Sequence, residues 1–174
     1  MRSVPAPTLM ERYVVDSSFF LDLWKDDGAF SKEIFVGIWD ALEEGVASGE
    51  IIAPKIVREE LRNTTDIALR EWTSDRINVF IPFDTAQLAS VTEIVQRFRG
   101  YAEEARNLAD PQVVALARVR GLTVLTSEKR VPTLGKNPKM PNVCESFGVK
   151  WLSIKSYCAA EGIELLRAVP EAAG

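Results

Sequence analysis

Short apolar segments rich in β-branched residues alternate with helical segments along the chain, and this alternation constrains the fold more than any other feature. Strands are predicted at residues 13–15, 51–53, 122–126 and 149–152, and a weaker one at residues 78–81. Helical stripes of apolar residues lie between them. This order favours a mostly parallel sheet with helices on both faces. We therefore expect an α/β fold of three layers, α/β/α.

Capping residues mark the ends of several helices. Gly49 is expected to end a helix over residues 31–48. Asp110 is expected as the N-cap of a helix whose first residue is Pro111. A polar loop is expected over residues 128–141. The remaining helices are predicted to begin near Phe19 and to cover residues 55–63, 66–73, 85–99, 142–147 and 154–160.

The length of 174 residues fits one domain, which we place at residues 11–165 with flexible tails at 1–10 and 168–174. The first ten residues lack the apolar core of a signal peptide. The chain contains no uninterrupted apolar run of about 18 residues, so we expect no membrane-spanning helix. Two cysteines, Cys144 and Cys158, supply neither a disulfide framework nor a four-ligand zinc site. We expect a cytoplasmic protein with no membrane partner.

The chain contains no histidine. This excludes Ser-His-Asp and Cys-His catalysis, HExxH zinc proteases and ribonuclease chemistry that uses imidazole as acid or base. Carboxylate, lysine, hydroxyl or metal chemistry remains. The formal charge of −4 hides an uneven distribution: residues 1–60 carry 12 acidic against 6 basic residues, or −6, and residues 111–160 carry 8 basic against 2 acidic, or +6. An acidic cleft beside a phosphate-attracting rim is one interpretation of this asymmetry, and solvated surface is the other.

Several acids follow predicted strands. Asp16 ends the first strand, Glu128 lies two residues past Thr126, and Glu59 and Glu60 lie one helical turn beyond the second strand. Ligands of open parallel sheets collect beyond the carboxyl ends of the strands. Together with Asp110, these acids could meet at one edge. Gathered carboxylates raise one another's pKa unless a cation compensates, and oxygen ligands alone favour Mg²⁺ or Mn²⁺ over zinc.

Each acid also has a structural interpretation. Asp110 and Asp16 could serve as helix caps. Glu59 and Glu60 are adjacent on a helix, so only one of them can face the cleft. Glu128 is one of two acids in the +6 segment, which argues against simple surface solvation.

Five segments resemble the PIN domain, a family whose members are mostly metal-dependent ribonucleases: YVVDSSFF, IIAPKIVREEL, ADPQVVALARVRG, VLTSE and NVCESFGVKWLS. The resemblance covers residues 13–152, and the last segment resembles a PIN-like subfamily related to VapC-type toxins. It implies a five-stranded sheet of order 3-2-1-4-5. It also implies a metal-dependent endoribonuclease with an RNA substrate, the toxin of a type II toxin–antitoxin pair with an antitoxin partner and possible homodimers.

The resemblance further implies which residues form the site. Asp16 and Asp110 match the acids that bind the main Mg²⁺ or Mn²⁺. Glu60 and Glu128 match the acids that complete the site or hold a second ion. The fourth acid is Glu128 where the family usually has Asp, and Pro111 replaces a commoner apolar residue. The hydroxyls that would orient these carboxylates belong to Ser18 and Thr126.

The loop after Glu128 is basic. Lys129, Arg130, Lys136 and Lys139 are placed to hold RNA phosphates beside the metal, and a solvated loop is the equal alternative. The substitution at Glu128 also leaves open a PIN-like module that is catalytically weak or inactive and binds RNA or a protein partner. A phosphate-transferring enzyme of the haloacid-dehalogenase or response-regulator type fits less well, because the second aspartates of those enzymes are missing around Asp16.

Overall fold

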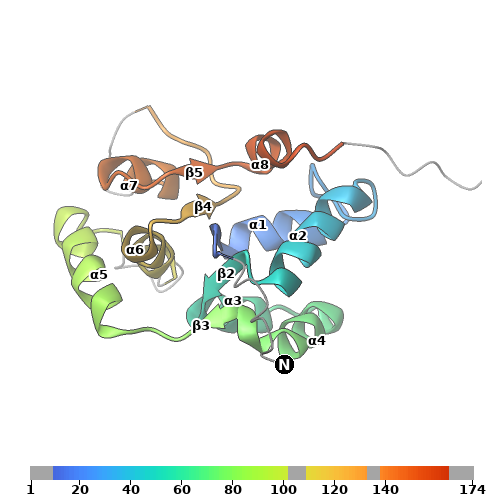
Figure 1. Cartoon of the computed structure of the whole chain (residues 1–174), viewed down its shortest axis with the longest axis horizontal. Helices are drawn as coiled ribbons and strands as arrows, with labels where there is room; N and C mark the ends of the chain where they lie inside the picture. Colours follow the sequence, from blue (N-terminus) through green and yellow to red (C-terminus); the bar gives the residue numbers. More distant parts are fainter. Residues whose placement is uncertain (1–9, 102–108, 133–137, 165–174) are drawn as a thin grey trace, which may run out of the picture.

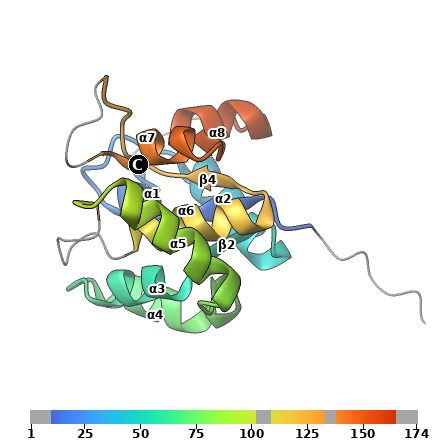
Figure 2. The same ribbon diagram turned by 90° about the vertical axis from the view of Figure 1, so that its left-hand side faces the viewer.

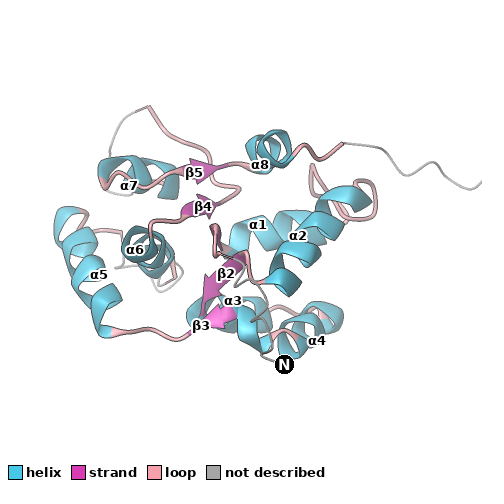
Figure 3. Ribbon diagram, viewed as in Figure 1, coloured by secondary structure: helices cyan, strands magenta, loops and turns pink. Residues whose placement is uncertain are grey.

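The computed structural model describes residues 10–101, 109–132 and 138–164. Its centre is a five-stranded parallel sheet of order β3-β2-β1-β4-β5 (Figures 1 and 3). The strands are β1 (Tyr13–Val15), β2 (Ile51–Pro54), β3 (Phe80–Ile81), β4 (Thr123–Leu125) and β5 (Trp151–Leu152). Both the parallel arrangement and the predicted order are confirmed. The predicted tails at 1–10 and 168–174 lie outside the described residues, except for Met10.

Helices cover both faces of the sheet. In Figure 1, α5, α6 and α7 lie to the left of the strands, and α1, α2 and α8 lie to the right, with α3 and α4 below beside β3. The three-layer α/β/α prediction is confirmed. The helices are α1 (Ser17–Trp24), α2 (Val36–Ser48), α3 (Lys55–Arg62), α4 (Ile67–Asp75), α5 (Thr85–Arg97), α6 (Asp110–Arg120), α7 (Met140–Ser146) and α8 (Ile154–Glu161), with a 3₁₀ turn η1 (Ile77–Val79).

The central strand and the central helix form the core. Every residue of β1 is buried, and so are the residues of α6 from Pro111 to Ala117 apart from the half-buried Gln112. A strand buried on both faces is expected to be a continuous apolar run rather than an alternating one. Yet the strand Tyr13–Val15 ends directly at a charged residue, Asp16. Within the described residues, no helix is long and apolar enough to cross a bilayer.

Several helix boundaries differ from the prediction, and the start of α2 differs most. The helix predicted over 31–48 begins only at Val36, because residues 31–35 form turns: the Ser31 carbonyl accepts from the amides of Ile34 and Phe35, and the Ser31 hydroxyl accepts from the amide of Glu33. Such local serine bonds compete with helix formation. Conversely, α7 begins at Met140, inside the segment predicted as a loop to residue 141. Gly49 does end α2, at a φ of 81°.

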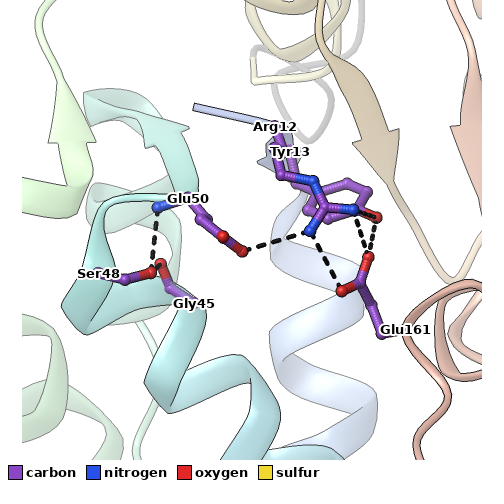
Figure 4. A network of polar contacts seen from close by, with 6 residues as sticks. All are labelled: Arg12, Tyr13, Gly45, Ser48, Glu50 and Glu161. Carbon is purple, nitrogen blue, oxygen red and sulfur yellow. Dashed lines mark hydrogen bonds and ion pairs between the residues drawn. The ribbon is translucent and has the colours of Figure 1, made fainter. Parts of the chain in front are cut away.

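A polar network joins three elements at the amino ends of the strands (Figure 4). The Arg12 guanidinium lies 2.7 Å from the Glu161 carboxylate and 3.5 Å from that of Glu50. The hydroxyl of Tyr13 also donates to Glu161, and burial raises the pKa of this tyrosine to about 12. The network ties the start of β1 to α8 and to the turn before β2. It lies at the edge of the sheet opposite to the one that the strands reach at Asp16.

Candidate active site

Four carboxylates converge at the carboxyl edge of the sheet, and we call them the acid cluster: Asp16, Glu60, Asp110 and Glu128. Asp16 follows β1 directly and Glu128 follows β4. Glu60 lies on α3, which continues from β2, and Asp110 is the first residue of α6. Each carboxylate therefore comes from a different segment, and the strand order β2-β1-β4 places three of those segments side by side.

Asp16 occupies the N-cap position of α1, but its side chain makes no capping bond. Its Oδ2 instead accepts hydrogen bonds from the hydroxyls of Ser18, at 2.5 Å, and Thr126, at 3.1 Å. The residue is 3% exposed. Burial raises its pKa above the usual range, against the hydrogen bonds from Ser18 and Thr126, and the charge of Glu128 adds to the rise. The capping interpretation of Asp16 therefore does not explain its carboxylate.

Glu60 is the member of the Glu59–Glu60 pair that faces the cluster. Its Oε2 accepts a hydrogen bond of 2.7 Å from the Ser17 hydroxyl, whereas Glu59 is exposed. Burial raises the pKa of Glu60, and the negative charge of Asp16 raises it further. This coupling places the Glu60 carboxylate within electrostatic reach of Asp16.

Asp110 has a strongly displaced carboxyl pKa. Burial and the charges of Asp16, Glu128 and Glu60 raise the pKa of Asp110 to about 9. The prediction that Asp110 caps its helix was wrong: the N-cap is Ala109, and Asp110 lies within the first turn, before Pro111. Asp110 is the first residue of the helix rather than its N-cap, and its carboxyl group feels the negative charges of the other three acids.

Glu128 is held by the start of α7. Its Oε2 accepts from the Met140 amide at 2.7 Å, and its Oε1 lies 4.0 Å from the Nζ of Lys139. The Glu128 amide donates to the Thr126 hydroxyl at 3.1 Å, and that hydroxyl in turn donates to Asp16. Thr126 therefore connects two members of the cluster.

The cluster suits a hard divalent cation by its chemistry but is open in this conformation. Its donors are carboxylate oxygens, which Mg²⁺ and Mn²⁺ prefer. The charge of Lys139 opposes their mutual repulsion and lowers the pKa of Asp110. Nevertheless, in residues 10–101, 109–132 and 138–164, no three His, Cys, Asp or Glu side chains lie close enough to hold one ion. A cation held by one or two of these carboxylates would complete its shell with water, as Mg²⁺ commonly does.

Of the predicted RNA-binding residues in the loop after β4, only Lys139 is shown next to an acid of the cluster within the described residues. Lys139 lies beside Glu128, and Lys129 is exposed. Arg130 forms an ion pair of 2.9 Å with Glu145, which also accepts from Trp151. Lys136 lies outside the described residues. Among the described residues predicted to bind RNA, Lys139 lies beside the cluster, and the exposed Arg130 differs from the exposed Lys129 by its ion pair with Glu145.

Three residues of the site were not predicted from the sequence. Ser17 donates a hydrogen bond to Glu60, whereas the sequence motif Asp16-Ser17-Ser18 pointed to Ser18 as the orienting hydroxyl. Asn142 is 4% exposed, and its side-chain amide bonds the backbone amide and carbonyl of Val131, at 3.0 and 2.8 Å. Tyr101 is buried beside the cluster. For Asn142 and Tyr101, only the tertiary structure identifies the contact.

Comparisons with known proteins agree with this architecture. The crystal structure of FitAcB from Neisseria gonorrhoeae superposes with a TM-score of 0.50 and 15% identity, covering 82% of this chain and 98% of that one. Such a likeness supports the three-layer α/β/α fold. No curated protein matches the chain. Residues 13–165 match the family model described as "Domain of unknown function (DUF4411)". Because this match spans most of the chain, the protein belongs to the DUF4411 family.

Proposed function

We propose that the chain is a metal-dependent endoribonuclease that hydrolyses RNA phosphodiester bonds. The observation that carries this proposal is the convergence of four carboxylates on one edge of a PIN-like sheet, where burial and mutual repulsion raise the pKa of Asp16, Glu60 and Asp110. Grouped acids with perturbed pKa values are typical of functional sites. A bound cation would offset the repulsion between these negative charges.

The residues have distinct roles in this proposal. Asp16 and Asp110 would hold the main Mg²⁺ or Mn²⁺, and Glu60 and Glu128 would complete the site or hold a second ion. The bound cation would activate water and offset the charge that develops on the phosphodiester. Ser18 and Thr126 keep the Asp16 carboxylate in one orientation by donating to its Oδ2. Lys129 and Lys139, with Arg130 and Lys136, would hold the phosphates of the RNA.

We also propose that this nuclease is the toxin of a type II toxin–antitoxin pair in the cytoplasm. The resemblance of residues 142–153 to VapC-type relatives supports the antitoxin partner, and the free cysteines Cys144 and Cys158 suit a reducing compartment. Expression of the chain should arrest growth, and co-expression of a small neighbouring reading frame should restore it. Growth arrest that persists with Asp16→Asn would contradict a toxic nuclease activity.

The test of the enzymatic activity is cleavage of a labelled RNA oligonucleotide with Mn²⁺ and with EDTA. The wild-type chain should cut in Mn²⁺ alone, and Asp16→Asn should lose at least about 100-fold in rate. Asp40→Asn is the matched control, because Asp40 is exposed on α2 and lies outside the cluster. Equal cleavage by Asp16→Asn and Asp40→Asn would refute the assignment of the site.

A second candidate is a PIN-like module that binds RNA or a protein partner without cutting. The open arrangement of the cluster favours it, because no three acidic side chains of the described residues are close enough to share an ion. Calorimetric titration separates the two candidates. Mn²⁺ binding that is lost in Asp110→Asn favours the nuclease, and the absence of Mn²⁺ binding at millimolar concentration favours the module.

A further inference from the structure

Tyr101 carries a buried hydroxyl without a partner. The residue is 2% exposed, and within the described residues its hydroxyl makes no hydrogen bond. Most buried side-chain polar groups in folded proteins are hydrogen-bonded, because an unpaired one loses its water without compensation. The unpaired hydroxyl of Tyr101 therefore requires an explanation.

The packing of α5 on α6 places Tyr101 beside the acid cluster. The two helices are antiparallel, because Arg118 near the end of α6 contacts Glu93 and Ser90 within α5, at 2.6 and 3.4 Å. Figure 2 shows them side by side. The chain just after α5 therefore lies next to the beginning of α6, where Asp110 stands. Tyr101 belongs to that segment, since its amide donates to the carbonyl of Phe98 at 2.9 Å.

The electrostatics of Tyr101 agree with this position. Burial raises the pKa of its phenol well above the ordinary value, and the charges of Asp110, Glu128 and Asp16 raise it further. The hydroxyl thus keeps its proton and acts as a donor in a region of negative charge. A buried donor that lacks an acceptor within the described residues, beside a cluster of carboxylates, is what a site without its ligand would contain.

We propose that Tyr101 is a positioning residue of the acid cluster, whose hydroxyl donates a hydrogen bond inside the cluster once a divalent cation is held there. The acids of the cluster would hold the cation, and the hydroxyl of Tyr101 would donate to an oxygen of the filled site. This inference rests on the proposed function, because it requires the cluster to bind a cation. Outer donors of this kind orient the carboxylates that ligate metal ions.

The test is the Mn²⁺ affinity of the full chain carrying Tyr101→Phe, which removes the hydroxyl and keeps the ring. We expect the Kd for Mn²⁺, measured by calorimetry, to rise about ten-fold. The Tm of the cation-free chain should stay the same or rise, because the lost hydroxyl had no partner. Tyr157→Phe is the matched control: Tyr157 is also buried, but it packs against Tyr13 and Phe19, beside the polar network of Figure 4.

The outcomes distinguish this inference from the proposed function. A wild-type chain that binds Mn²⁺ with the same Kd as Tyr101→Phe overturns the role of Tyr101 and leaves the nuclease proposal intact. An equal loss of affinity in Tyr157→Phe also overturns it, because the effect would then reflect general packing. A wild-type chain that binds no Mn²⁺ overturns the proposed function and this inference together. Weaker binding in Tyr101→Phe alone, with an unchanged or higher Tm, supports it.

Discussion

The side chain of Asp16 does not cap the helix that follows it. It stands where an aspartate would cap α1, yet its carboxylate accepts from Ser18 and Thr126 instead of the helix amides. Its carboxylate is therefore held by two side-chain hydroxyls, at a position where the charge of Glu128 also acts on it.

Comparing variants of Glu59 and Glu60, which are neighbours on α3, tests which of the two side chains belongs to the site. Glu60→Gln should lower Mn²⁺-dependent RNA cleavage by at least about 100-fold, because it removes a charged oxygen donor that Ser17 holds toward Asp16. Glu59→Gln should leave the rate unchanged, because Glu59 is exposed. Single-turnover cleavage of one RNA by the two variants is the measurement. Similar losses in both variants would mean that α3 acts through its general charge.

The displaced pKa of Asp110 predicts how stability depends on pH without a cation. The folded chain keeps a proton on Asp110 up to about pH 9, whereas the unfolded chain releases it near 3.8. The folded state therefore binds more protons within this interval, and the free energy of unfolding falls as pH rises through it. Asp110→Asn removes this contribution, so its stability relative to wild type should increase from pH 5 to pH 8.

Urea denaturation in EDTA at several pH values measures this difference. Asp16 and Glu60, whose pKa values are also raised, should leave a smaller slope of the same sign in the variant. Parallel stability curves for wild type and Asp110→Asn would show that Asp110 is ionised in the folded chain, and the electrostatic account of the cluster would be wrong.

At the level of elements, periodicity predicted the positions of the five strands and of most helices. Asn78 and Val79, predicted as strand, belong instead to the 3₁₀ turn η1. Helix starts were wrong where side-chain hydrogen bonds set them. The turns around Ser31 delay α2 to Val36, because a serine side chain offers the backbone other partners than a helix does. The start of α7 at Met140 depends on the bond from its amide to Glu128, a contact between residues twelve apart. Such tertiary contacts leave no mark on the apolar periodicity of a single segment.

Asn142 on α7 fastens the loop that follows β4. Its side chain accepts from the Val131 amide and donates to the Val131 carbonyl, and so keeps the segment after Glu128 against α7. Asn142→Ala should lower the free energy of unfolding by about 1–3 kcal/mol, because two backbone groups lose their partner. Mn²⁺ affinity should fall as well, since Glu128 lies on the same loop.

Chemical denaturation and Mn²⁺ calorimetry of Asn142→Ala check these two effects. Ser146→Ala is a suitable control on the same helix: its hydroxyl bonds only the carbonyl of Asn142 and does not reach the loop. A loss of stability in Asn142→Ala with an unaltered Mn²⁺ affinity would separate the loop from the cation site.

For the whole molecule, the parallel topology is what turns scattered acids into one site. Alternating strands and helices indicated that the carboxyl ends of the strands share an edge, and so predicted that Asp16 and Glu128 lie near one another. The choice of Glu60 over Glu59 came from the resemblance to PIN domains. Tyr101 and Asn142 could not be predicted, because their contacts depend on how α5 packs on α6 and how α7 packs on the loop.

Exposed lysines lie at both ends of the strands, and only those at the carboxyl edge are expected to affect RNA binding. Lys129 and Lys139 lie on the loop at the carboxyl edge, next to Glu128, whereas the exposed Lys150 precedes β5 at the opposite edge. If the loop holds RNA phosphates, each lost contact should reduce the slope of log affinity against log salt by about 0.7 for a single strand. The double variant Lys129→Ala/Lys139→Ala should therefore have a slope lower by about 1.4.

Fluorescence anisotropy of a labelled RNA, titrated in EDTA at several salt concentrations, measures this slope in the absence of cleavage. Lys150→Ala should bind with the wild-type slope, because its charge lies away from the acid cluster. Arg130→Ala should have the smaller effect of the loop residues, since Glu145 already neutralises the Arg130 guanidinium at 2.9 Å. An unchanged slope in the double variant would mean that RNA approaches the acid cluster from another side, and that the positive segment 111–160 serves solvation rather than substrate binding.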